Sequence, residues 1–126
     1  MRAIDTNVLV RLLARGDADQ VSAAERFVSA GAWVSHLALV EATWVLDSVY
    51  GRDAADIATA VEMLLDHQDL TVQDPDTVSA AVRQLRTTPK LGFSDCLMLE
   101  VARRAGHLPL GTFDRALGRL DAAQRL

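Results

Sequence analysis

Four acidic residues stand where the chain could bring them around one reaction centre. Asp5 follows a short apolar segment in MRAIDTNVLV, and Asp114 follows another in GTFDR. Asp95 opens an apolar pattern in GFSDCLML, and Glu41 is the only charged residue in LALVEATWVL. These positions are strand ends or helix starts, where open parallel sheets bind their ligands. We therefore expect the four carboxylates to converge on one edge of a sheet.

Carboxylates that share a pocket repel one another, and each then has a raised pKa. A hard divalent cation such as Mg²⁺ or Mn²⁺ removes this conflict, because it prefers oxygen ligands. One or two such ions can activate a water and stabilise the attacking and leaving oxygens of a phosphodiester. Metal-dependent cleavage is therefore the chemistry that this set favours, with Asp5 as a buried metal ligand.

Structural roles compete with this interpretation. Asp5 could be the N-cap of the helix that follows it, and Asp114 could cap the last helix in the same way. Asp95 in a first helical turn would be stabilised by the helix dipole. Glu41 lies about one turn inside its helix, where a capping role fails. The four positions taken together favour the metal site.

Apolar patterns alternate along the chain between short strands and longer helices. Glycine and proline mark several boundaries: Pro75 suits a helix start, Gly106 a helix end, and Ser94 is a candidate N-cap. We expect strands over 2–4, 32–35, 70–73 and 108–113, with 123–126 as a weak fifth candidate, and helices over 7–15, 19–31, 37–51, 53–67, 75–88, 94–106 and 115–120. Strands separated by helices predict right-handed crossovers, a mostly parallel sheet and helices on both faces. The expected fold class is α/β, with residues 1–126 as one domain.

Composition limits the other possibilities. The chain has 126 residues, of which 50% are hydrophobic and 24% charged, and this is typical of a globular domain. No apolar run approaches the roughly 20 residues of a membrane span. The single cysteine, Cys96, cannot form an intramolecular disulfide, so we expect a reducing cytoplasm. His36, His67 and His107 share no ligand spacing, which argues against zinc.

The charge balance agrees with one acidic pocket. The net charge is −4, from 17 acidic residues and 13 Lys plus Arg. Without the four candidate acids the remaining acidic and basic residues are equal in number. The excess negative charge is thus one pocket's worth, which two divalent ions would cancel.

Four strings, RAIDTNVLVRLL, VEATWVL, GFSDCLMLEVAR and LGTFDRAL, together resemble the PIN domain, in particular the VapC-type toxins of bacterial toxin–antitoxin pairs. The resemblance runs from residue 1 to about 120. It implies a five-stranded parallel sheet of order 3-2-1-4-5, a Mg²⁺- or Mn²⁺-dependent ribonuclease activity and inhibition by a cognate antitoxin protein. The residues that match the catalytic and metal-binding acids of the family are Asp5, Glu41, Asp95 and Asp114. Asn7 and Thr112 match polar positions that support the metal site.

Partners follow from the basic and apolar residues. An RNA substrate could be guided by Arg83, Arg86, Lys90, Arg103, Arg104, Arg115 and Arg119. The segments 37–51 and 53–67 carry more apolar residues than a small domain usually exposes, so we expect a homodimer or antitoxin contact there. The aromatic residues Phe27, Trp33, Trp44, Tyr50 and Phe93 fit core or dimer packing better than base stacking.

Other functions remain as alternatives. A catalytically inactive PIN-like module that binds RNA or protein is the main one, although all four acids are present. Receiver and haloacid-phosphatase domains also place an Asp after the first strand. They need a second Asp two residues later, or a paired acidic cluster and a late catalytic Lys, whereas this chain has Asn7 and the single lysine Lys90. No glycine-rich loop follows the first strand, so a Rossmann domain is excluded.

Overall fold

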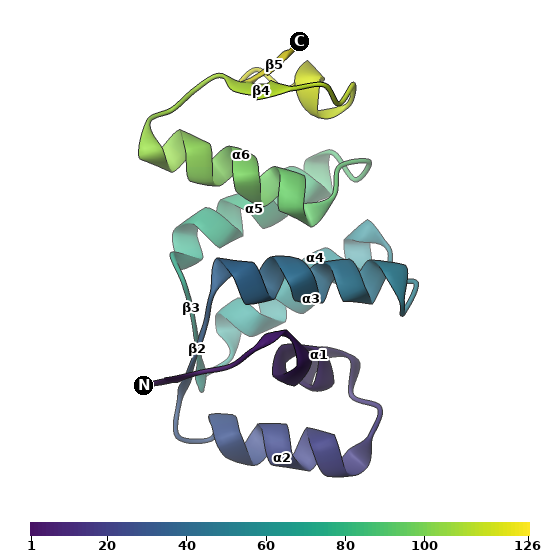
Figure 1. The fold of residues 1–126 in the computed structure, drawn as a ribbon, viewed down its shortest axis with the longest axis vertical. Helices are drawn as coiled ribbons and strands as arrows, with labels where there is room; N and C mark the ends of the chain where they lie inside the picture. Colours follow the sequence, from purple (N-terminus) through teal and green to yellow (C-terminus); the bar gives the residue numbers. More distant parts are fainter.

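The computed structural model describes all 126 residues and has an α/β fold of six α-helices and five strands (Figure 1). The expected fold class is therefore confirmed. The elements in chain order are β1 (Arg2–Ala3), α1 (Thr6–Ala14), α2 (Ala18–Val28), β2 (Ala32–Val34), α3 (His36–Ser48), α4 (Ala54–Asp66), β3 (Leu70–Val72), α5 (Pro75–Thr87), α6 (Phe93–Ala105), β4 (Leu110–Thr112), the 3₁₀-helix η1 (Leu117–Arg119) and β5 (Ala123–Arg125).

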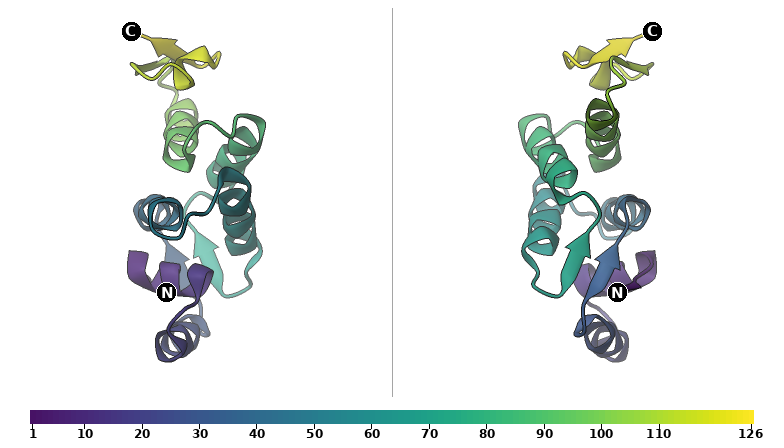
Figure 2. Two further views of the ribbon diagram at one scale, coloured as in Figure 1. Left: turned by 90° about the vertical axis from the view of Figure 1, so that its right-hand side faces the viewer. Right: turned by 90° about the vertical axis from the view of Figure 1, so that its left-hand side faces the viewer.

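The main sheet is parallel, in the order β1-β2-β3. Arg2 pairs with Ala32, and Ala32 in turn pairs with Leu70. The sheet lies between two helical layers, with α1 and α3 on one side and α4 and α5 on the other (Figure 2). Right-handed parallel crossovers account for this arrangement, because each helix packs back onto the sheet that its strands form.

The last two strands form a separate parallel pair, β4-β5. The fifth strand is thus present, but the expected continuous order 3-2-1-4-5 is wrong at one point, since β1 and β4 are not paired. Strand β1 has only two residues, both exposed, and offers little edge for a further strand. In Figure 1 the β4-β5 pair lies at the C-terminal end of the molecule, beyond α6. The β4-β5 pair packs against η1 and not against the edge of the main sheet.

Side-chain caps define the starts of four helices. Asp5, Asp17, Ser35 and Asp53 each accept a hydrogen bond from a backbone N–H in the first turn of α1, α2, α3 and α4. Each such cap stabilises its helix by about 1 kcal/mol. Helix α6 starts one residue earlier than expected, with Gly92 as its N-cap, so the candidate cap Ser94 lies inside the helix. The expected last helix is only the three-residue η1.

One hydrophobic core joins the sheet to both helical layers. It contains 24 buried residues, among them Leu39 and Leu46 of α3 and Val61 of α4. Cys96 is fully buried in it, and this burial raises the pKa of the thiol to about 12. Phe93 is also buried, as expected for a core aromatic residue, but Trp44 stands outside the core. No helix of the structure is both long and apolar enough to cross a membrane.

Candidate active site

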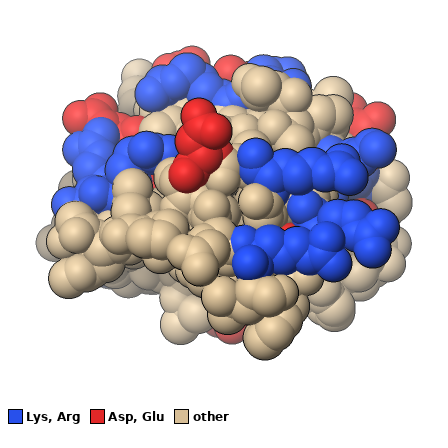
Figure 3. All heavy atoms as spheres, turned by 90° about the horizontal axis from the view of Figure 1, so that it is seen from above, with Lys and Arg blue, Asp and Glu red and all other residues tan.

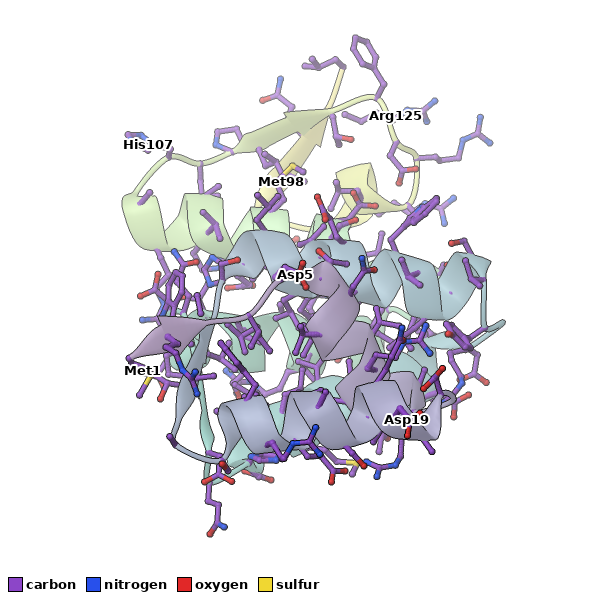
Figure 4. All side chains as sticks on the ribbon, turned by 60° about the horizontal axis from the view of Figure 1, so that its bottom comes forward. Met1, Asp5, Asp19, Met98, His107 and Arg125 are labelled. Carbon is purple, nitrogen blue, oxygen red and sulfur yellow. The ribbon has the colours of Figure 1, made fainter.

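Asp5 lies at the junction of β1 and α1 (Figure 4). Its Oδ1 accepts a hydrogen bond of 3.0 Å from the backbone N–H of Val8, and its backbone is extended, so Asp5 is the N-cap of α1. The side chain is exposed, and the expectation that Asp5 is buried is therefore wrong. Capping uses one carboxylate oxygen of Asp5 and leaves the other free. Asp5 shares its exposure with β1, whose two residues also lie at the surface.

Glu41 is held close to this junction by Thr6. The hydroxyl of Thr6 donates a hydrogen bond of 2.6 Å to Oε2 of Glu41 and so connects the first turn of α1 with α3. Glu41 projects from a helix whose other face supplies Ala42 and Leu46 to the core. The apolar face of α3 thus orients Glu41 toward α1. Thr6 is a residue that we missed in the sequence, although its place directly after Asp5 could have indicated it.

Asp95 and Asp114 make up the second part of the site. Asp95 lies half-buried in the first turn of α6. Burial raises the pKa of its carboxyl, the negative charge of Asp114 raises it further, and the backbone N–H of Gly92 acts in the opposite direction. An electrostatic effect of this kind requires the two carboxylates to lie near each other. The loop after β4 therefore carries Asp114 toward the start of α6.

Backbone hydrogen bonds fix the position of Asp114. Its own N–H donates to Oγ1 of Thr112 at 3.0 Å, and its Oδ2 accepts from the N–H of Leu117 at 2.7 Å. Thr112 thus supports the loop that carries the carboxylate. Asn7, the other polar position implied by the resemblance, lines a groove between α1 and α2 beside Gln20.

The contacts of the four carboxylates fall into two parts, Glu41 with the start of α1 and Asp95 with Asp114. Helices α3 and α6, which carry Glu41 and Asp95, pack against each other. No three His, Cys, Asp or Glu side chains meet in a geometry that would hold a metal ion. Even so, none of the four acids forms a salt bridge with a Lys, Arg or His side chain. The donor set consists entirely of oxygen atoms without a cationic partner, and this chemistry fits Mg²⁺ or Mn²⁺.

Some basic residues are held in ion pairs within the protein, and others are free to contact a ligand. Arg86 pairs with Glu62 and Thr59 of α4, and Arg103 pairs with Glu100 on its own helix. Arg86 thus faces α4 and is poorly placed to guide RNA. Figure 3 shows the end of the molecule that carries β4 and β5, where Lys and Arg side chains gather on both sides of a small acidic group. Phosphates could be attracted to this face.

A comparison with protein families gives a match to the PIN domain over residues 3–123. The chain belongs to the PIN domain family. PIN domains are generally nucleases, which are hydrolases that typically use divalent metal ions, and the family suggests RNA binding for this chain. Comparisons with curated proteins and with solved structures give no match.

Proposed function

We propose that this PIN domain is a Mg²⁺- or Mn²⁺-dependent endoribonuclease and the toxin of a type II toxin–antitoxin pair. The observation that carries the proposal is the set of four acids without a basic partner, Asp5, Glu41, Asp95 and Asp114. Their oxygens would hold the ion. When bound, it would supply an activated water and neutralise charge on the cleaved phosphodiester.

The chain's own residues would position these ligands. Thr6 restrains Glu41 by its hydrogen bond, and the N–H of Val8 fixes one oxygen of Asp5. Thr112 and the N–H of Leu117 hold the loop of Asp114. Ligands that are fixed in this way bind a metal ion more tightly than mobile ones, because less conformational freedom is lost on binding.

Exposed apolar residues support the proposal that this chain binds other protein chains. Large apolar side chains on α3, on α4 and in the turn between them are exposed to solvent, namely Leu37, Val49, Tyr50 and Met63. A homodimer contact, an antitoxin contact or both would cover such residues. We place this single-domain toxin in the cytoplasm, where its one buried thiol would stay reduced.

Chelation of metal ions tests the proposed activity. Purified, antitoxin-free protein is incubated with total RNA in EDTA, and Mg²⁺ or Mn²⁺ is then added back in excess. We expect no cleavage in EDTA and restored cleavage with either or both ions. Robust cleavage in EDTA would contradict the metal mechanism. RNA binding without cleavage under every condition would favour the inactive binding module instead.

A further inference from the structure

A cavity of about 290 Å³ opens beside the candidate active site, between the second half of α3 and the connection from α5 to α6. Val40 and Ser94 line it, and these residues are the chain neighbours of Glu41 and Asp95. The helix segments that carry Glu41 and Asp95 thus adjoin the cavity wall, although neither acid lines it. Its volume is close to the lower end of the range for small-molecule sites, about 300 to 1,000 Å³.

Two cations line this cavity without a carboxylate partner. Arg52 and Lys90 both contribute to the wall, and neither forms a salt bridge, although Asp47 and Asp53 line the same cavity. Asp53 already accepts the N–H of Asp56 as the cap of α4. The two cationic side chains are thus free to contact a phosphate group, and the carboxylate of Asp47 is free to accept hydrogen bonds.

An exposed aromatic ring stands at the same place. Trp44 lines the cavity, and 66% of its surface is accessible to solvent. An indole is seldom left so exposed without a partner, because its burial removes a large apolar area from water. A flat ring next to free cations is the combination that single-stranded nucleic acids use, with bases stacked on aromatic rings and phosphates on basic residues.

We propose that this cavity binds one nucleotide of single-stranded RNA, adjacent to the phosphodiester that is cleaved. Lys90 and Arg52 contact its phosphate, the base stacks on Trp44, and Asp47 accepts a hydrogen bond from the ribose. The cavity wall has two acidic and two basic residues, and the acidic ones disfavour inorganic phosphate as the ligand. A nucleotide instead offers a phosphate to the cations, hydroxyl groups to a carboxylate and a base to the aromatic ring. A ribose hydroxyl facing a carboxylate also favours RNA over DNA. This inference rests on the proposed ribonuclease function and assigns that activity a substrate subsite.

Tryptophan fluorescence measures this binding without any cleavage. A Trp33→Phe protein keeps Trp44 as its single indole, and it is titrated with a six-nucleotide, mixed-sequence RNA in EDTA. We expect quenching of Trp44 and weaker binding of the matching DNA. In a direct RNA-binding assay Trp44→Leu should lower the affinity about fivefold or more. Lys90→Gln and Arg52→Gln should each flatten the salt dependence. The double variant, which releases the one phosphate that both residues contact, should reduce the logarithmic slope by about 0.7.

The matched control is Arg26→Gln, which removes the same charge from the exposed last turn of α2. It should leave both affinity and salt slope unchanged. The proposal is overturned if the cavity variants bind RNA as the wild type does. It is also overturned if Trp44→Leu dissociates a dimer in sedimentation while RNA affinity stays constant, because the ring would then contact a second copy.

Cleavage kinetics separate this inference from the proposed function. With Mg²⁺ present, Lys90→Gln should raise KM with little change in kcat, since it affects binding and not the reacting atoms. Unchanged KM in an active ribonuclease removes the subsite and leaves the nuclease standing. Loss of affinity in the cavity variants of a protein that never cuts RNA supports the subsite and contradicts the nuclease.

Discussion

The hydroxyl of Thr6 donates a 2.6 Å hydrogen bond to the carboxylate of Glu41 and joins the start of α1 to α3. This bond brings Glu41 to the residue next to Asp5, although the two acids lie far apart in the sequence. It also fixes one of the two Glu41 oxygens and leaves the other available. The contact therefore assembles the first half of the candidate site.

Removing this hydroxyl should weaken cleavage more than it weakens the fold. Thr6→Val loses the hydrogen bond, at a cost of about 1 kcal/mol in the free energy of unfolding. The cleavage rate should fall about 10- to 100-fold, which is typical when a residue that orients a metal ligand is lost. Thr6→Ser keeps a hydroxyl and should restore most of the activity. Thr71→Val, at an exposed position of β3, is the control, and full activity of Thr6→Val would exclude an orienting role.

Asp5, as the N-cap of α1, and Asp114, as a backbone acceptor before η1, should each show both a structural role and a catalytic one. Each accepts a backbone N–H, from Val8 and Leu117 respectively. Asp5→Ala should therefore lower the free energy of unfolding by about 1 kcal/mol in EDTA, whereas Asp5→Asn keeps a capping oxygen and should cost less. The same order is expected at Asp114. Urea unfolding gives the stabilities, and both substitutions should abolish cleavage. An Asn variant with normal activity would leave capping as the only role.

Asp95 should make the metal-free protein less stable as the pH rises. Burial and the nearby charge of Asp114 raise the pKa of Asp95 above its unfolded value. Between these two pKa values the folded state binds more protons than the unfolded state, so the free energy of unfolding falls with increasing pH. Asp95→Asn removes this dependence and should be more stable than wild type at neutral pH in EDTA. The difference should vanish at acidic pH below both pKa values, and an equal difference at every pH would contradict the assignment.

The thiol of Cys96 should be inert in the folded protein. Burial raises its pKa to about 12, so almost no thiolate exists at neutral or mildly alkaline pH. A disulfide reagent such as Ellman's should therefore react slowly with native protein and rapidly with protein unfolded in guanidinium. Rapid labelling of the native state would indicate that α6 opens readily or that the thiol lies at the surface.

Local sequence signals predicted the elements well. Apolar spacing gave α4 and α5 within one or two residues, since each helix buries one face, and the weak strand candidate at 123–126 became β5. Pairing between strands that are far apart in the chain was harder to predict. Nothing local indicates that β1 and β4 remain unpaired, because the pairing of strands far apart in the sequence depends on how the helices between them in the chain pack. Ser94 failed as a cap because α6 begins with Phe93, whose burial fixes the helix start one residue earlier.

The candidate site divides in the same way. Its acidic residues could be proposed from their places after strands and at helix starts. The Thr6–Glu41 bond could not, because it depends on the packing of α1 against α3. The sequence left core and dimer packing open for Trp44, since an apolar helix such as α3 does not indicate from its sequence which face lacks a partner, and the structure shows the residue exposed.

Cleavage by variants of the four acids tests the central claim most directly. Initial rates on a labelled RNA are measured with Mg²⁺ for Asp5→Asn, Glu41→Gln, Asp95→Asn and Asp114→Asn. Asp56→Asn, on an exposed turn of α4, serves as the control. The account predicts a loss of about 100-fold or more for each of the four, larger than for an orienting residue, and no change for the control. Wild-type rates in Asp5→Asn and Asp95→Asn would contradict it, because neither carboxylate could then be holding the ion.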